Sequence, residues 1–312
     1  MAVGVVVNPV AGGGRMRRRW PDIERVLTRE LGVLDVKETS EPGEACDLAR
    51  QLSMDGAELV IAAGGDGTVS EAVDGLLQAR AAMGNAADLA IVPVGIGCDF
   101  VRGLGLVADI DRLAARIAAG DKRTIDAGCV NYVGDGGALA SRHFINIASL
   151  GVSGPTDRSV NSAKRVGYFS GKLVFLFHTV REMLRYKFQH VRVTIDDGEP
   201  IEARIALVAI ANAPYFGAGM KIAPDAAPDD GLFEVVIIRG VSKFSLLKDF
   251  RLVYSGSHTS MPSCTILRGR KIIVEPLGST LADAALIDID GESPGRIPAT
   301  FEVIAAAITV RG

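Results

Sequence analysis

Along the first 127 residues, short apolar runs alternate with longer stretches in which apolar residues recur at a helical spacing. The runs are continuous and rich in Val, Ile and Ala, as in strands that are buried on both faces of a parallel sheet. Strands are therefore predicted over 3–7, 34–39, 59–63 and 88–93, and helices over 17–31, 43–55 and 69–78. Because strands and helices alternate, we expect a parallel α/β sheet with helices on both faces.

After residue 127 the pattern changes, and strand-like runs follow one another with little helix between them. Pro, Gly and Asp-Gly turns separate several runs, which is typical of antiparallel sheets. The predicted strands cover 142–150, 190–195, 201–211, 232–238, 270–275, 285–289 and 300–310, with helices over 166–186 and 243–254. We expect an α/β domain over 1–127 and an antiparallel β-sandwich domain over 128–312, whose extreme C-terminus can return to the first domain.

Charge and cysteine usage narrow the class of protein. The chain carries 34 Lys and Arg against 37 Asp and Glu, a net charge of −3, which gives no general attraction for nucleic acid. The four cysteines form no C-x-x-C pair and are expected to be reduced thiols of a cytoplasmic protein. The first residues lack the basic region of a signal peptide, and no apolar run reaches the roughly 20 residues of a transmembrane helix.

The strongest candidate for ligand binding is the turn after the third predicted strand, which consists of Gly64, Gly65, Asp66, Gly67 and Thr68. Glycines let a backbone approach a phosphate where a Cβ atom would collide. The helix that follows presents free N–H groups and the positive end of its dipole. An ordinary strand-to-helix turn needs fewer glycines, so we predict a phosphate or nucleotide site here.

A second glycine loop follows the first predicted strand and contains Asn8, Pro9, Val10, Ala11 and Gly12. Its spacing matches neither the dinucleotide fingerprint nor the P-loop, so a plain turn is the alternative to a phosphate site. Ligands of open α/β sheets bind at the carboxyl edge of the strands, where both loops are expected. Asp99, after the fourth predicted strand, is either a carboxylate at this edge or a helix cap.

Two acidic segments of the second domain carry further candidate chemistry. Residues 223–231 hold Asp225, Asp229 and Asp230, which could offer oxygen ligands to Mg²⁺ or form an ordinary hairpin turn. In residues 288–292, the period-two spacing predicts Asp288 and Asp290 on one strand face. A carboxylate at a strand end can take a proton from a hydroxyl during phosphoryl transfer, and a solvated hairpin is the alternative.

The predicted helix over 166–186 is rich in large apolar residues and is surrounded by Lys and Arg. A basic amphipathic helix of this kind can lie on an anionic membrane. The alternative is a helix that packs on its own sheet.

Taken in order, these motifs resemble the diacylglycerol kinase catalytic-domain family, which includes soluble bacterial diacylglycerol kinases and relatives such as sphingosine kinases. The resemblance runs nearly end to end, although the G-G-D-G-T core alone is shared with NAD kinases. The segments that carry it are 8–14, Thr39 before 43–45, 64–68, 93–102, 224–231 and 290–292.

The resemblance implies a two-domain lipid kinase with an NAD-kinase- or phosphofructokinase-like first domain and with ATP in the interdomain cleft. It implies that Asp290 is the general base, and that Asp230 and the carbonyl groups of Ala227 and Leu232 hold Mg²⁺. The lipid substrate implies peripheral membrane contact. The residues implied to bind the nucleotide are Asn8, Pro9, Val10, Ala11, Gly12, Thr39, Gly64, Gly65, Asp66, Gly67, Thr68, Val69, Ser70, Glu71 and Asp99.

The chain departs from the family pattern at three positions of the nucleotide loops. Ile96 stands where the family has Thr, Cys98 where it has Asn, and Ala11 where it has Ser. Two alternatives to a lipid kinase are therefore kept, namely a kinase of a soluble metabolite such as NAD and a lipid- or nucleotide-binding regulator with weakened catalysis. The lipid could be diacylglycerol, a sphingoid base or a polyprenyl or glycolipid alcohol, and an exposed strand edge could pair two chains into a homodimer.

Overall fold

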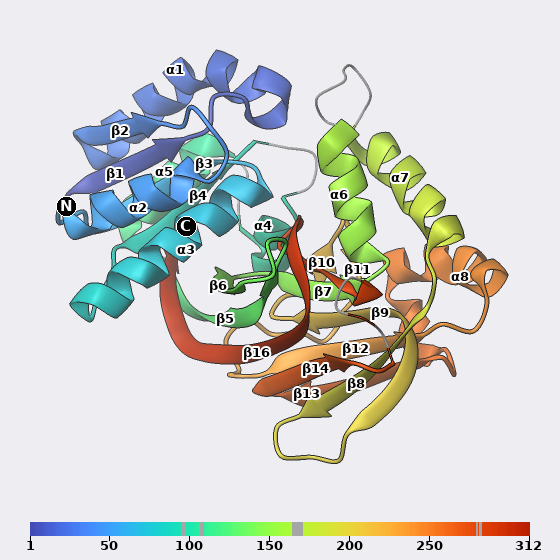
Figure 1. Ribbon diagram of the computed structural model, residues 1–312. Coiled ribbons are helices and arrows are strands. Elements are labelled where there is room, and N and C mark those ends of the chain that lie inside the picture. The colour runs from blue at the N-terminus through green and yellow to red at the C-terminus, as the bar shows by residue number, and fades with distance from the viewer. Residues whose placement is uncertain (95–97, 107–108, 164–170, 279, 281–282) are drawn as a thin grey trace. The chain divides into compact units, whose positions relative to one another are not determined.

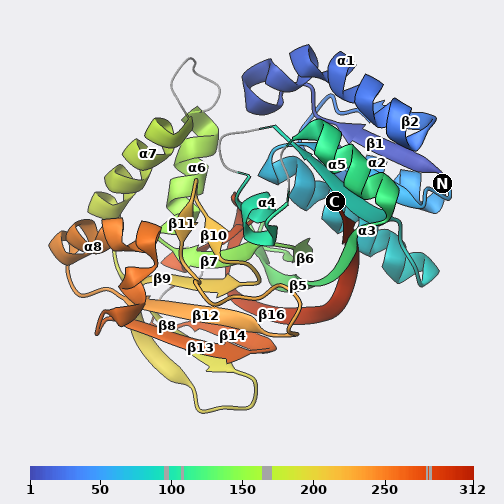
Figure 2. The same cartoon turned by 180° about the vertical axis from the view of Figure 1, so that it is seen from behind.

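The computed structural model describes residues 1–94, 98–106, 109–163, 171–278, 280 and 283–312 (Figures 1 and 2). The chain forms two compact units, the first of residues 1–127 with 305–312 and the second of residues 128–304. The last strand, β16 (Glu292–Arg311), begins in the second unit and ends in the first. The fold therefore contains a return of the chain end to the N-terminal unit.

The first unit is a sheet with the strand order β2-β1-β3-β4-β16, in which each neighbouring pair is parallel. Helices follow each of the first four strands, as expected where parallel strands are joined by crossovers. Its elements are β1 (Val3–Val7), α1 (Ala11–Leu31), β2 (Leu34–Glu38), α2 (Glu44–Met54), β3 (Leu59–Gly64), α3 (Asp66–Met83), β4 (Asp88–Pro93), α4 (Asp99–Leu104) and α5 (Ile110–Ala119).

Helices cover both faces of this sheet because its strands are apolar on both sides. Helices α1 and α5 share a buried cluster with the odd-numbered residues of β1, and Met16, Trp20, Ile23 and Leu27 form the inner stripe of α1. On the opposite face, Gly4 of β1 lies so close to α2 that an added Cβ would be 2.9 Å from Leu52 Cδ1. Helices α2 and α3 pack on each other along that face.

The second unit consists mainly of antiparallel strands with the order β13-β12-β9-β7-β15-β16, and β8, β14, β5 and β6 extend the pairing. Its elements are β5 (Lys122–Gly134), β6 (Leu139–Phe144), β7 (Ile147–Gly151), α6 (Ser153–Ala163), α7 (Gly171–Arg185), β8 (Gln189–Ile195), β9 (Ile201–Ala211), β10 (Tyr215–Phe216), β11 (Met220–Lys221), β12 (Phe233–Arg239), α8 (Lys243–Ser255), a 3₁₀ turn (Ser257–Ser260), β13 (Cys264–Gly269), β14 (Lys271–Pro276), β15 (Leu286–Ile289) and β16.

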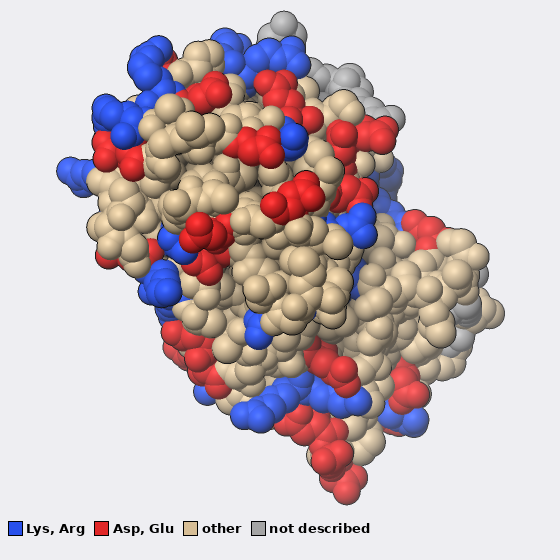
Figure 3. All heavy atoms as spheres, turned by 90° about the vertical axis from the view of Figure 1, so that its left-hand side faces the viewer, with Lys and Arg blue, Asp and Glu red and all other residues tan. Residues whose placement is uncertain are grey.

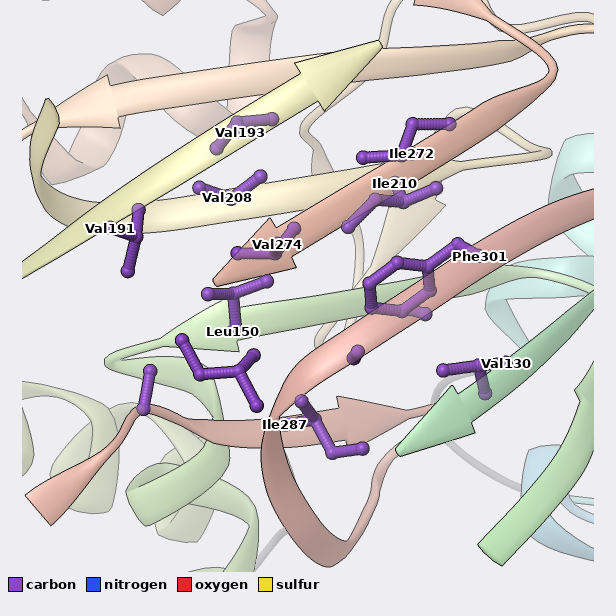
Figure 4. Close-up of a cluster of buried hydrophobic side chains, with 14 of the residues drawn as sticks. Val130, Leu150, Val191, Val193, Val208, Ile210, Ile272, Val274, Ile287 and Phe301 are labelled. Carbon is purple, nitrogen blue, oxygen red and sulfur yellow. The ribbon is translucent and has the colours of Figure 1, made fainter. Parts of the chain in front are cut away.

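The strands of the second unit enclose one large apolar core (Figure 4). Val191 and Val193 of β8, Ile272 and Val274 of β14, and Phe301 of β16 point into it, and their spacing of two shows that alternate residues face inward. A second cluster lies on the other face of β9 and β12, under α8 and the β10–β11 hairpin. Strands β9 and β12 therefore lie between two apolar layers.

The predicted mixture of an α/β unit and a β-rich unit is confirmed, and several boundaries are corrected. The predicted strand over 142–150 is two strands, β6 and β7, with a break at Ile145 and Asn146. The predicted strand over 300–310 begins earlier, at Glu292. Helix α7 covers the described part of the predicted helix over 166–186. The first residues of that predicted helix, 166–170, lie outside the described residues.

Within the residues that the structure describes, two helices and four strands escaped the sequence pattern. Helix α6 has a mostly polar sequence in which Val160 is the one large apolar residue buried, so it shows no apolar stripe. Helix α5 and strands β5, β10, β11 and β13 also lie in segments for which no element was predicted. None of the helices in the described parts of the chain combines the length and hydropathy that crossing a bilayer requires. On the face in Figure 3, basic and acidic side chains are interspersed.

Candidate active site

Asn8 joins the two glycine loops of the first unit. Its backbone N–H donates to Ala63 O at 2.9 Å, and its side-chain Nδ2 donates to Thr68 Oγ1 at 3.0 Å. Its Oδ1 accepts the backbone N–H of Val10 at 3.2 Å. Asn8 therefore holds the end of β1, the first loop and the start of α3 in one fixed arrangement.

The first loop depends on glycine for its backbone shape. Gly12, Gly13 and Gly14 have φ angles of 63°, 69° and 79°, a left-handed region that side chains with a Cβ rarely adopt. The Gly12 carbonyl accepts a hydrogen bond from Arg15 Nε at 2.9 Å, which folds this guanidinium back along the loop. Arg15 is an exposed cation at the carboxyl edge of the sheet, and the motif analysis assigned it no role.

Helix α3 begins directly after β3, and no side chain caps it. Its first N–H groups and its positive dipole end can therefore bind an anion. A Cβ on Gly64 would lie 2.5 Å from Thr68 Oγ1, so Gly64 is needed for packing. In the part of the chain that the structure describes, a Cβ on Gly65 would approach no atom closer than 3.9 Å, and one on Gly67 would meet nothing within 4 Å. The fold itself does not require these two glycines, as expected where a ligand needs the space.

Other predicted nucleotide residues have internal partners. The Glu71 carboxylate accepts the N–H groups of Gly43 at 3.0 Å and Ala45 at 3.3 Å, so it caps the N-terminus of α2. Val69 and Ser70 are buried. Thr39 is half-buried and donates its backbone N–H to Val7 O at 2.9 Å. The structure thus gives Glu71 a clear structural task.

Asp99 is the first residue of α4 and is not its cap, the alternative that the sequence left open, because the N-cap position is Cys98. The Asp99 carboxylate pairs with Arg102 Nη1 at 3.0 Å. Burial, together with the negative charges of Asp66 and Asp99, raises the pKa of the neighbouring Cys98 thiol to about 12. Arg15 and Arg102 act on the same thiol in the opposite direction. Two carboxylates and two guanidinium groups therefore lie near Cys98 at the edge of this sheet. Ile96, the other departure from the family pattern in this loop, lies outside the described residues.

In the second unit, the predicted metal ligand Asp230 already has two partners. Its Oδ1 accepts the N–H of Leu232 at 3.0 Å, and its Oδ2 pairs with Arg268 on β13. Among the described residues, no group of three or more His, Cys, Asp or Glu side chains is arranged to hold a metal ion. Arg268 thus supplies the positive charge next to Asp230 that a cation would bring.

A buried acid close to this loop was missed by the sequence analysis. Glu234 on β12 is 2% exposed, and its Oε1 has no hydrogen-bond partner in the described part of the chain. Burial raises its pKa, and the charge of Asp225 adds to this effect. An orphaned carboxylate oxygen is costly unless a proton or a cation satisfies it. The loop therefore fits a hard cation by its oxygen donors, on condition that Arg268 gives up Asp230.

Asp290 lies in the tight turn between β15 and β16, not within a strand. Ile289 pairs with Glu292, and the two residues between them, Asp290 and Gly291, have φ angles of 49° and 89°. Positive φ at both central positions is the type I′ hairpin geometry that Asp-Gly favours. The expectation that Asp288 and Asp290 share one strand face is therefore wrong, because the strand ends at Ile289.

The Asp290 carboxylate is held by three backbone N–H groups. Its Oδ2 accepts Ile145 N at 3.0 Å, and its Oδ1 accepts Asn146 N at 3.1 Å and Ile147 N at 3.0 Å. These are the residues where the predicted strand over 142–150 breaks into β6 and β7. Since donors of this kind stabilise a negative charge, the structure fixes a half-buried carboxylate in one orientation.

Glu292 follows the same turn and pairs with Arg142 Nη1 at 2.6 Å, with its side chain 40% exposed. The turn thus presents two carboxylates, of which one is fixed by backbone donors and one by a guanidinium group. This arrangement can accept a proton and orient a hydroxyl group.

Comparison with known proteins supplies the family. The model of the diacylglycerol kinase catalytic domain matches residues 2–130, and that of the YegS C-terminal NAD kinase beta sandwich-like domain matches residues 146–312. A diacylglycerol kinase of Staphylococcus saprophyticus is 27% identical over 95% of this chain and 90% of the relative. One of Mycobacterium tuberculosis is 28% identical over 99% of this chain and 94% of the relative.

Solved structures agree on the fold. The crystal structure of a Bacillus anthracis protein, 23% identical, matches with a TM-score of 0.76 over 99% of this chain and 96% of that one. A diacylglycerol kinase structure from the same organism, 21% identical, matches with a TM-score of 0.70. The chain therefore belongs to the family that joins a diacylglycerol kinase catalytic domain to a YegS-type C-terminal domain. The family predicted from the sequence, and with it the prediction of a lipid kinase, is confirmed.

Proposed function

We propose that this protein transfers the γ-phosphate of ATP to the hydroxyl group of a membrane lipid, with diacylglycerol as the first candidate. The observation that carries the proposal is the family match over both units, with curated relatives named diacylglycerol kinase that cover nearly the whole chain. A lipid acceptor is preferred over a soluble metabolite such as NAD because α7 and α8 expose large apolar side chains.

The first unit is assigned to ATP. The uncapped start of α3 and the open space at Gly65 and Gly67 suit a phosphate chain, because backbone N–H groups and a dipole end favour negative charge. Arg15 and Arg102 are at hand to neutralise additional phosphate charge. Asn8 has the task of keeping the two loops in register.

The second unit is assigned to the acceptor chemistry. The lipid hydroxyl oxygen attacks the γ-phosphorus, the bond from that phosphorus to the β,γ-bridging oxygen breaks, and ADP leaves. The hydroxyl proton passes to Asp290, whose carboxylate is oriented by three backbone donors. Such a reaction depends mainly on positioning and charge neutralisation, so a rigid carboxylate suits it.

Mg²⁺ is assigned to Asp230 and the backbone carbonyl groups of Ala227 and Leu232, which are hard oxygen donors. When bound, the ion would add positive charge to a strongly acidic loop. Arg268 competes with it for Asp230. The Arg268→Gln variant is therefore expected to bind Mg²⁺ about tenfold more tightly than wild type. The Asp230→Asn variant is expected to lose Mg²⁺ binding at this loop.

The rise in melting temperature on titration with Mg²⁺ in the absence of ATP measures this binding. Equal Mg²⁺ responses of wild type and both variants would remove the ion from this loop. A matched control is Arg192→Gln, which breaks a surface ion pair with Glu202 on β8 and β9 and leaves the 223–231 loop intact.

The membrane partner is assigned to α7 and α8. Leu173, Leu176, Phe177 and Leu184 recur at helical spacing along α7 and are exposed, whereas Met183 and Tyr186 face α8. Phe244 of α8, with 79% of its area exposed, is the largest apolar contributor of that helix. Exposed basic residues on or directly after the same two helices are Arg185, Lys187, Lys243, Lys248 and Arg251. Helices that expose both apolar and basic side chains suit an anionic lipid surface.

The Phe177→Ser/Phe244→Ser double variant is expected to bind vesicles containing anionic lipid at least tenfold more weakly, because two deep apolar contacts are lost. Its turnover of a short-chain, water-soluble acceptor should stay at the wild-type level. Vesicle co-sedimentation and an assay of the soluble acceptor separate the two effects. Unchanged sedimentation would place the membrane contact elsewhere.

A cytoplasmic location with peripheral contact to the membrane is proposed on the same grounds, and the free thiols of all four cysteines suit a reducing compartment. A homodimer stays a prediction. Transfer of labelled γ-phosphate from ATP to a lipid, with the product identified by mass, tests the proposed function. An NAD acceptor in the same assay tests the soluble alternative.

A further inference from the structure

A second acidic site lies behind the turn that carries Asp290, wholly within the second unit. Asp288 on β15 is 3% exposed, and Asp157 on α6 is 9% exposed. Their side chains form a hydrogen bond with each other. Neither the sequence motifs nor the proposed chemistry gives this pair a task.

The surroundings of Asp288 supply neutral donors. Ser149 Oγ, fully buried, donates to Asp288 Oδ2 at 2.8 Å, and Ser153 Oγ lies 2.7 Å from the same hydroxyl oxygen. The hydroxyl group of Ser149 has one proton, so it can donate to only one of these two oxygens at a time. The backbone N–H of Gly291 donates to Asp288 Oδ1 at 2.8 Å. This last bond joins Asp288 directly to the turn of Asp290.

Two carboxyl groups can hydrogen-bond to each other only if a proton lies between them. Burial, which disfavours a charge, raises the pKa of Asp288 from its usual 3.8 to about 6, with a smaller contribution from the negative charge of Asp290. The hydrogen bonds from Asp157, Ser149 and Gly291 act in the opposite direction and do not cancel this rise. The protons of such a pair belong to both groups together. The pair therefore keeps a proton at a pH at which an isolated aspartic acid has lost it.

The charged groups on neighbouring elements have other principal partners within the described residues. Arg158 on α6 pairs with Asp135 at 2.5 Å, Arg142 on β6 with Glu292 at 2.6 Å, and Arg296 on β16 with Asp135 at 3.7 Å. Strand β7 contributes only the neutral Ser149 to the pair. Other titratable or charged groups on these elements are His143 on β6, His178 and Arg181 on α7, which both bond to Ser159 of α6, and Asp290 itself.

We propose that Asp157 and Asp288 share one proton and act as a positioning pair that holds the Asp290–Gly291 turn in place. The shared proton cancels the repulsion between the two carboxylates, so Asp288 can stay where it accepts the Gly291 N–H. The effect on turnover rests on the proposed function, whereas the effect on stability does not.

The first experiment measures unfolding by urea as a function of pH. Because the folded pKa is raised, the pair's contribution to stability is complete below the unfolded value of 3.8 and is lost as the pH rises to about 6 and beyond. Asp288→Asn cannot titrate, yet its amide can donate to Asp157 and its oxygen can accept from Gly291. We expect the urea midpoint of the variant, compared with wild type, to rise steadily through this pH window.

The control for this experiment is Asp197→Asn, which alters an exposed aspartate in the β8–β9 turn and should follow wild type at every pH. If the urea midpoints of wild type and Asp288→Asn differed by the same amount at all pH values, the proposal of a shared proton would be wrong. The measurement needs no substrate, so it decides the inference even if the protein phosphorylates no lipid.

The second experiment separates positioning from mere packing. Asp288→Leu removes the acceptor of the Gly291 N–H and is expected to lower kcat about tenfold while the KM for ATP changes less than about twofold. Asp288→Asn should recover most of this loss, because its amide can form both the bond to Asp157 and the bond from the Gly291 N–H. If Asp288→Asn lost as much turnover as Asp288→Leu below pH 6, where wild type keeps the shared proton, a negative charge rather than a shared proton would be required, and the proposal would be wrong.

Discussion

Asp290→Asn is expected to lower kcat by a factor of about 10³ or more and to leave the KM for ATP within about twofold of wild type. An amide is no base. In addition, both oxygens of the Asp290 carboxylate accept hydrogen bonds from backbone N–H groups, and the NH₂ group of an asparagine would replace one of these acceptors with a donor. Both changes act on the acceptor hydroxyl and on the turn, whereas the residues assigned to ATP belong to the first unit. Steady-state kinetics with saturating lipid and varied ATP measure the two constants.

The control for Asp290→Asn is Asp197→Asn, an equal change of charge at an exposed turn of the same unit. Thermal unfolding of both variants shows whether the turn still folds. Near-wild-type turnover in a folded Asp290→Asn protein would remove Asp290 from the mechanism and leave Glu292, on the same turn, as the carboxylate to test.

Gly67→Ala is expected to raise the KM for ATP at least tenfold without loss of stability. The new Cβ meets no atom of the described residues within 4 Å, and alanine in a helix stabilises by roughly 0.5–1 kcal/mol relative to glycine. The same methyl group stands at the start of α3, where the proposal puts a phosphate. Gly65→Ala, whose Cβ has 3.9 Å to its nearest atom, should behave in the same way.

Gly136→Ala provides the matched control, because its Cβ also meets nothing within 4 Å but lies in the β5–β6 turn of the second unit. Nucleotide affinity from a binding titration, together with melting temperature, is measured for all three variants. If Gly67→Ala and Gly65→Ala bound ATP as wild type does, the start of α3 would not be the phosphate site.

The regular parts of the fold were readable from local patterns. The strands over 3–7 and 59–63 are continuous apolar runs, and α8 begins at Lys243, directly after Ser242, whose side chain caps the helix by accepting Ser245 N at 3.1 Å. Helix α6 was missed because its buried face is made of Ser, Thr, Gly and Asp. Its packing partner is a polar network with Asp288, which periodicity cannot reveal.

The candidate site was predictable in its residue types but not in its pairings. The glycine turns and the Asp-Gly hairpin were recognisable by local conformational need. The bond from Asn8 to Thr68 spans 60 residues and that from Arg268 to Asp230 spans 38, so no local pattern contains them. The Glu71 cap on α2 is a third contact of this kind. Each of these contacts depends on how strands are ordered in the sheet.

The most direct test of the central claim is phosphate transfer by the pure protein. Wild type, Asp290→Asn and Asp197→Asn are incubated with Mg²⁺, ATP labelled in its γ-phosphate, and either diacylglycerol in mixed micelles, a sphingoid base, or NAD. The account predicts label in a lipid product whose mass equals that of the acceptor plus one phosphate, in wild type and in Asp197→Asn but not in Asp290→Asn. Label in NAD alone, or tight ATP binding without transfer to any lipid, would contradict it.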